Sequence, residues 1–122
     1  MNSSNVTGAK FGQLFRLCDI LDSMYQTAVG GEVTVRPGME RNAQDAFNSI
    51  VNFIELLTDE KVMEIQALMS MGYNSDESYE VNLNDARANF SEFSRSQVSG
   101  KGSNLKGYIE TGLRKRNEQR GQ

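Results

Sequence analysis

The segment from Asp45 to Met71 constrains the fold most, because its apolar residues follow the period of two successive amphipathic helices. The apolar positions are Ala46, Phe47, Ile50, Val51, Ile54 and Leu57, and after a break Val62, Ile65, Leu68 and Met69. At the break, Thr58 can cap the second helix, and Asp59 and Glu60 place negative charge in its first turn. The two apolar stripes need the rest of the chain for burial, so this segment predicts a helical domain.

Further helices are expected on both sides of this pair. Helical periodicity predicts helices over about 9–29, 39–57, 59–71 and 104–116, and another that is capped at Ser75 and carries apolar residues as far as Phe93. Gly30 and Gly31 are expected to end the first helix, and Gly72 the third. With 122 residues and a single proline, the chain is predicted to be one all-α domain, a bundle of about five helices over residues 1–122. Residues 1–7 and 118–122 are expected to be disordered, and residues 94–104, rich in Ser and Gly, to form the longest loop.

One short segment departs from this helical pattern. Residues 32–36 alternate polar and apolar side chains, as a strand does. The sequence offers no second candidate strand to pair with it. Two interpretations stay open: an extended connector, or a strand that pairs with a second molecule across a dimer interface.

The composition argues against catalysis. The chain has no histidine, which removes the commonest general base and the commonest transition-metal ligand. Its single cysteine, Cys18, lies among apolar residues and is expected to be buried filler. We therefore expect no enzyme activity, no catalytic residues, no cofactor and no metal site.

The sequence also predicts where in the cell the protein is located. The first residues are polar and uncharged, without the pattern of a signal peptide, and no apolar run is long enough to cross a bilayer. We expect a cytoplasmic protein that does not associate with membranes.

Charge is divided along the chain. Between Glu55 and Asp85 there are eight carboxylates and one lysine, whereas from Arg95 onward there are seven Lys and Arg and two Glu. Either the two regions neutralise each other within the fold, or the acidic region docks a basic partner.

For the second case, the candidate partner-binding patch contains two tyrosines in an acidic neighbourhood. Its residues are Tyr73, Asp76, Glu77, Tyr79 and Glu80.

A different class of function would use the basic region. The candidate residues for contact with nucleic acid or another anion are Lys101, Lys106, Arg114, Lys115 and Arg116. The segment Gly100–Asn104 precedes a predicted helix, so it is either a flexible loop or a cradle of backbone N–H groups for an anion. The net charge of −3 argues against a dedicated nucleic-acid binder.

The second half of the chain carries an Ile-x-x-Leu segment, an acidic turn, an apolar helix with Gly, an Ala-Arg pair and a closing Tyr-Ile-Glu-x-Gly-Leu. The residues are Ile54, Leu57, Asp59, Glu60, Ala67, Leu68, Gly72, Ala86, Arg87, Leu105, Tyr108, Ile109, Glu110, Gly112 and Leu113. This pattern, over about residues 50–113, resembles a family of small uncharacterised bacterial proteins, a domain of unknown function. The chain has Gly72-Tyr73-Asn74 where the family has Gly-Arg-Gly, and it lacks the family's proline before the last helix. The resemblance implies a fold and no activity.

The first half contains Phe11-Gly12-Gln13-Leu14-Phe15, followed by Ala28-Val29-Gly30-Gly31 and Thr34-Val35-Arg36. These segments are similar to the C-terminal helical region of a CRISPR Cascade large subunit, which also occurs as a separate small subunit. This second resemblance implies a subunit of a complex that handles nucleic acid.

The function we expect is a non-catalytic module that presents an acidic helical face to a protein partner, which the sequence does not identify. A homodimer is a further candidate. The alternative is a small helical subunit or inhibitor of a CRISPR-type or phage-defence complex. Such a protein would contact nucleic acid through its basic C-terminal helix or mimic it with its acidic face.

Overall fold

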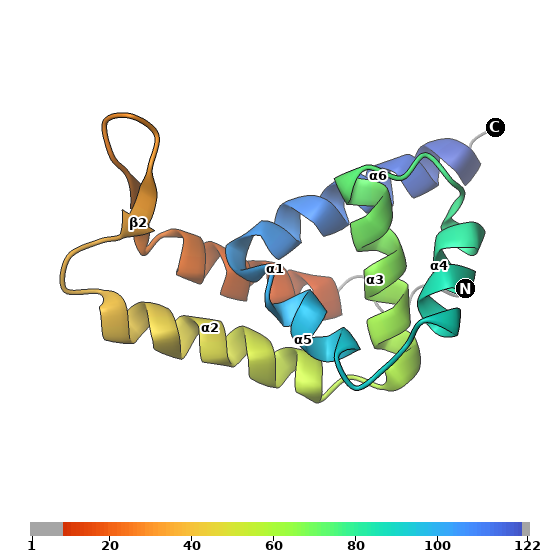
Figure 1. The fold of residues 1–122 in the computed structure, drawn as a ribbon, viewed down its shortest axis with the longest axis horizontal. Coiled ribbons are helices and arrows are strands. Elements are labelled where there is room, and N and C mark those ends of the chain that lie inside the picture. The colour runs from red at the N-terminus through yellow and green to blue at the C-terminus, as the bar shows by residue number, and fades with distance from the viewer. Residues whose placement is uncertain (1–8, 121–122) are drawn as a thin grey trace.

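The chain folds as the periodicity predicts, into a mostly helical single domain (Figure 1). The computed structural model describes residues 9–120. The elements in chain order are α1 (Ala9–Asp22), β1 (Tyr25–Thr27), β2 (Val33–Val35), α2 (Glu40–Glu55), α3 (Asp59–Tyr73), α4 (Tyr79–Ala88), α5 (Ser94–Ser99), the 3₁₀ turn η2 (Gly102–Asn104) and α6 (Leu105–Arg120). Within the described residues there are six α-helices, where about five were predicted. The disorder expected for residues 1–7, 121 and 122 concerns positions outside the described residues.

The connection between α2 and α3 has the predicted helix cap and the predicted acidic first turn. The Thr58 hydroxyl accepts a hydrogen bond from the Lys61 backbone N–H at 3.3 Å, and Asp59 and Glu60 occupy the first turn of α3. The apolar stripe of α2 is buried through Ala43, Ala46, Ile50 and Ile54.

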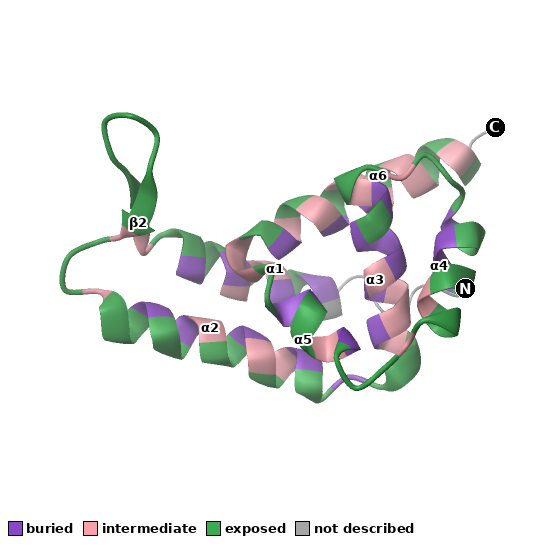
Figure 2. Cartoon of the chain, viewed as in Figure 1, coloured by how far each residue is buried: buried purple, intermediate pink, exposed green. Residues whose placement is uncertain are grey.

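The core is centred on α3, which packs against both α6 and α4 (Figures 1 and 2). Two glycines bring α3 and α6 into backbone contact. A Cβ built on Gly72 would lie 2.6 Å from the carbonyl carbon of Tyr108, and one built on Gly112 would lie 2.8 Å from that of Leu68. Gly72 is the residue before the last of α3 and does not have a positive φ, so the prediction that it ends the third helix is wrong. The close crossing leaves no room for a side chain at this position.

The segment after α1 differs from the prediction. The first helix ends at Asp22 instead of near Val29, and β1 pairs antiparallel with β2 in the register Tyr25–Val35, Gln26–Thr34 and Thr27–Val33. Gly30 and Gly31, with φ of 102° and 91°, form the hairpin turn. The interpretation of residues 32–36 as an extended connector was wrong, and so was the premise that the chain has no partner strand, because that strand lies in a stretch whose apolar spacing also fits a helix. Pairing of residues 32–36 with a second molecule stays a prediction.

The hairpin projects from the helices and is exposed over most of its length (Figures 1 and 2). Val29 is fully exposed at its tip, and Val33 keeps 60% of its surface accessible.

Two predictions about the second half also need correction. Residues 94–104 are not a loop but contain α5 and η2. Val98 is buried there, and Arg95 donates to the Leu57 carbonyl and to Asp59. Residues 118–120 are not disordered, because α6 continues to Arg120 and the Gln119 amide oxygen accepts a hydrogen bond from the Tyr79 N–H at 3.2 Å.

The helix α4 is shorter than predicted. Its cap is Ser78, whose hydroxyl accepts from the Val81 N–H, whereas the Ser75 hydroxyl accepts from the Glu77 N–H just before the helix. It ends at Ala88, so Phe90 and Phe93 do not continue its apolar seam.

No helix within residues 9–120 combines the length and the apolar composition that a membrane span requires.

Candidate functional site

The predicted acidic patch is divided by the fold. Asp76, Glu77 and Glu80 are exposed around the start of α4. Tyr79, in contrast, is buried at 7% exposure, and the guanidinium of Arg116 lies 3.8 Å from the centre of its ring. Burial raises the pKa of Tyr79 to about 12, and the nearby Glu64 carboxylate adds to the shift. Its ring therefore serves the contact between α4 and α6.

Tyr73 lies at the end of α3 and is 67% exposed. Its ring meets Tyr108 of α6 edge-on, with centroids 5.6 Å apart, and Lys101 Nζ lies 6.0 Å from its centroid. Tyr73 and Lys101 line a shallow hollow of about 450 Å³ together with residues of α3 and α6. The neighbours of the Tyr73 ring are thus an aromatic ring and a cation, and most of its surface faces solvent.

The outer face of α4 carries a group of exposed residues that were not predicted together from the sequence. α4 packs on α3 and buries Tyr79, Asn82 and Leu83. The exposed positions include Glu80, Val81 and Asp85, and Val81 is 40% accessible. Val81 and Asp85 are one helical turn apart, and Glu80 adjoins Val81, so an apolar side chain is flanked by carboxylates. The spacing of residues 77, 81 and 85 was the available signal for this face.

The basic candidates mostly contact the chain itself. Lys106 Nζ pairs with both carboxylate oxygens of Asp19, at 2.9 and 3.0 Å. This contact raises the pKa of Lys106. Lys115 Nζ donates to the Met71 carbonyl at 2.8 Å, at the C-terminal end of α3, and lies 4.0 Å from Asp76.

Of the remaining three candidates, Arg116 covers Tyr79 and Lys101 lies near Tyr73. Arg114 is exposed. Two ion pairs join the acidic region to the basic region: Arg95 with Asp59 at 3.2 Å, and Lys115 with Asp76 at 4.0 Å. Arg87, which lies outside the basic region, pairs with Glu60 at 2.6 Å, so three of the eight carboxylates of the acidic region have an ion-pair partner among the described residues. Neutralisation within the fold is therefore partial, and both sequence interpretations stay open.

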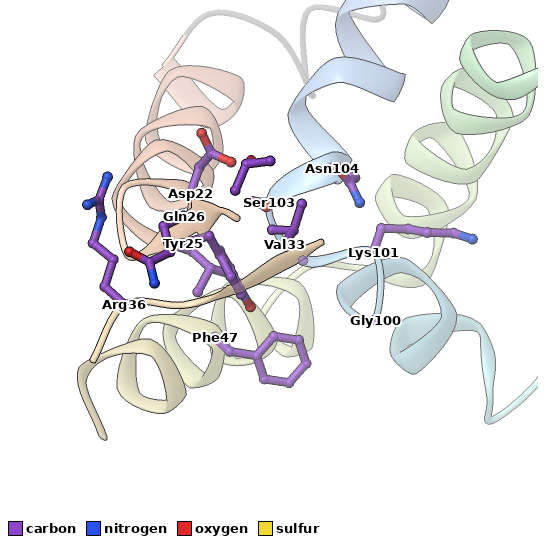
Figure 3. A pocket seen from close by; sticks show the side chains of 13 residues that line it. Asp22, Tyr25, Gln26, Val33, Arg36, Phe47, Gly100, Lys101, Ser103 and Asn104 are labelled. Carbon is purple, nitrogen blue, oxygen red and sulfur yellow. The ribbon is translucent and has the colours of Figure 1, made fainter. Parts of the chain in front are cut away.

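The segment Gly100–Asn104 borders an open groove of about 800 Å³, which is also lined by the hairpin, by the last residues of α1 and by Phe47 in the middle of α2 (Figure 3). Tyr25, Val33 and Phe47 contribute to its wall. Its two cations diverge: Arg36 and Lys101 lie on opposite sides, and both point away from the centre (Figure 3). The side chains of the groove therefore do not provide convergent donors for an anion. In the segment Gly100–Asn104, the backbone N–H groups of Gly100, Lys101 and Asn104 donate to carbonyl groups of the same chain.

One carboxyl group has an unusual environment. Glu64 lies on α3, and its Oε1 is enclosed without a hydrogen-bond partner among residues 9–120. Burial, and then repulsion from Glu60, raises the pKa of Glu64. Glu64 lines neither the groove nor the hollow beside Tyr73, so it has no described substrate-sized space in front of it.

The described part of the chain holds no group of three or more Cys, Asp or Glu placed to bind a metal ion. No protein-family model, curated protein or solved structure matches this chain. The two family resemblances inferred from the sequence therefore stay predictions.

Proposed function

We propose that this protein is a non-catalytic interaction module that binds a basic surface of a partner protein through the outer face of α4. The observation that carries the proposal is the state of two carboxylates on that face. Glu80 and Asp85 are exposed, and neither forms an ion pair among the described residues. Between them Val81 offers a small apolar contact. Helix faces recognise partners through apolar contacts flanked by charged residues, and Val81 with its two carboxylates forms a small surface of this kind.

The contrast between the acidic and basic residues supports this choice. Lys106, Lys115 and Arg116 are held by a carboxylate, a helix end and an aromatic ring of the same chain. Binding a phosphate backbone through them would require these contacts to break. Contact with nucleic acid through the basic C-terminal helix, as in a CRISPR-type or phage-defence complex, is therefore the less favoured alternative. Mimicry of nucleic acid by the acidic face is compatible with the proposal.

The experiment is affinity capture from a lysate of the native host with the tagged full chain and two matched double variants. Glu80→Gln with Asp85→Asn removes the two carboxylates of α4. Glu40→Gln with Asp45→Asn removes two exposed carboxylates of α2 at the same spacing, one of them also in the first turn of its helix. Both variants change the net charge equally. We expect a protein captured by the wild type to be lost with the α4 variant and retained with the α2 variant.

Equal capture by all three proteins, or equal loss from both variants, would contradict the proposal. In the second case the interaction would depend on total charge rather than on the α4 face. Retention of nucleic acid that weakens steeply with added salt would instead favour the basic residues.

A further inference from the structure

The hydrogen bonds of the hairpin show which backbone groups of β2 point to its open edge. At the two ends of the ladder, the Ala28 N–H donates to the Glu32 carbonyl at 2.7 Å, and the Arg36 N–H donates to the Met24 carbonyl at 2.8 Å. Glu32 and Arg36 therefore direct their backbone groups toward β1. Because the direction alternates along an antiparallel strand, Val33 and Val35 direct theirs away from β1, to the open edge of β2. Such unpaired groups form a template for another strand.

The sequence of this edge is self-complementary. In Glu32-Val33-Thr34-Val35-Arg36, an antiparallel copy centred on Thr34 places Glu32 opposite Arg36 of the second copy, twice by symmetry. Val33 then faces Val35, and Thr34 faces its own equivalent. Opposite charges, β-branched pairs and Thr–Thr pairs are each favourable across strands.

The hydrogen-bonding groups of the backbone also favour this register. In it, the Val33 and Val35 groups that face the open edge meet each other and can form hydrogen bonds on both sides of the two-fold axis. A shift by two residues in one direction separates both charge pairs. A shift in the other direction places Pro37, which has no N–H, opposite Val33. One register therefore satisfies both side chains and backbone.

We propose that a second copy of this chain pairs with β2 in this register, so that two hairpins form a four-stranded antiparallel sheet with two-fold symmetry. The hairpin projects from the helices, which leaves its strands accessible (Figure 1). A sheet of four strands also gives this short hairpin the support that a two-stranded hairpin lacks. The dimer does not depend on the α4 face, so either proposal can fail without the other.

The first experiment is disulfide cross-linking with two single cysteine variants of the full chain. Thr34→Cys places the thiols of the two copies opposite each other at the axis, where Cα atoms are about 4.5 Å apart, a separation that a disulfide spans. Gln26→Cys is the matched control, because Gln26 is the exposed partner of Thr34 on β1 but lies three strand spacings, about 14 Å, from its equivalent. We expect oxidised Thr34→Cys to migrate as a dimer on a non-reducing gel, and Gln26→Cys and wild type to migrate as monomers. Cross-linking of Thr34→Cys no faster than that of Gln26→Cys would overturn the proposal.

The second experiment measures dimer dissociation by analytical ultracentrifugation. Arg36→Glu and Glu32→Lys each create two like-charge pairs and are expected to raise the dissociation constant at least about tenfold. The double variant restores both pairs in reversed order and should recover the wild-type value. An equimolar mixture of the two single variants should form heterodimers, because each new charge meets its opposite.

Recovery of the wild-type dissociation constant by the double variant would also show that the single variants do not act merely by removing a contact of Arg36 within its own chain. Arg36 Nε donates to the Ser23 carbonyl at 3.2 Å, and the double variant does not restore that contact. Arg41→Glu, a reversal of the same sign on the exposed start of α2, should leave dimerisation unchanged. A wild-type monomer at the highest attainable concentration, or a dimer indifferent to these charges, would overturn the proposal.

Discussion

The crossing of α3 and α6 predicts opposite effects for two glycine-to-alanine changes in one helix. Gly112 is buried where α6 crosses α3, and a Cβ there would lie 2.8 Å from the carbonyl carbon of Leu68 and 3.0 Å from its Cα. Gly107, five residues earlier, is exposed, and a Cβ there would meet nothing within 4 Å. The helix itself favours alanine over glycine at both positions, so only the packing differs.

The size of the change in the free energy of unfolding follows from these distances. Non-bonded carbon atoms approach comfortably to about 3.5 Å, and the Leu68 carbonyl oxygen lies still closer to the added Cβ than the carbonyl carbon, so Gly112→Ala forces the two helices apart by about 1 Å or more. Overpacking costs about 1 to 3 kcal/mol, and a clash with backbone atoms, which cannot rotate away, falls in the upper part of that range, at about 2 to 3 kcal/mol, of which the alanine returns about 1 kcal/mol of helix propensity. We expect a net loss of about 1 to 2 kcal/mol for Gly112→Ala and a gain of about 0.5 to 1 kcal/mol for Gly107→Ala.

The assay is urea and thermal unfolding followed by far-ultraviolet circular dichroism. For a domain of this size the midpoint should fall by about 5 °C with Gly112→Ala and rise by about 3 °C with Gly107→Ala. Gly72→Ala, on the other side of the same crossing, should also destabilise, because its Cβ would overlap the Tyr108 carbonyl. A Gly112→Ala protein as stable as the wild type would refute the close crossing, and a Gly107→Ala protein that loses stability would refute the control.

Two further predictions concern the buried thiol of Cys18 and the partly buried ammonium group of Lys115. Burial raises the pKa of the Cys18 thiol to about 11. At pH 8 its reaction with a disulfide reagent should therefore be at least about a hundredfold slower than that of a free thiol, as absorbance would show. Because the thiol of the unfolded chain loses its proton at a lower pH than the buried thiol, the free energy of unfolding should also fall as the pH rises from 9 toward 11. A Cys18 thiol that reacts as fast in the native chain as in the unfolded chain would contradict the raised pKa. Lys115→Met removes the donor to the Met71 carbonyl at the end of α3 and should cost about 1 kcal/mol, measured by urea unfolding, whereas Arg114→Met on the exposed side of α6 should leave stability unchanged.

The candidate site was only partly predictable from the sequence. The acidic character of the region around Glu77 and Glu80 is a property of the sequence, and both residues are exposed. Whether a tyrosine within it faces solvent depends on what packs against it. Tyr79 is covered by Arg116, which follows 37 positions later, whereas Tyr73 stays 67% exposed. The combination of Val81 with Asp85 on one face could have been found from their spacing, but only once the start of α4 was known.

The sequence by itself determined what depends on neighbouring residues. The periodicity of residues 45–71 specifies α2 and α3, and Thr58 caps α3, because these effects act within one or two helical turns. Burial of Cys18 follows in the same way from its apolar neighbours.

Tertiary structure decided the features in which distant segments meet. The stretch Tyr25–Thr27 has apolar spacing that suits a helix, and it becomes a strand because β2 supplies its hydrogen bonds. Position 72, in the last turn of α3, requires glycine because the Tyr108 backbone occupies the place of a side chain. The ion pairs of Arg87 with Glu60, Arg95 with Asp59 and Lys106 with Asp19 also join residues 27 to 87 positions apart. Local propensities are small beside the energy of packing and pairing, so the contacts between distant residues decide where the two disagree.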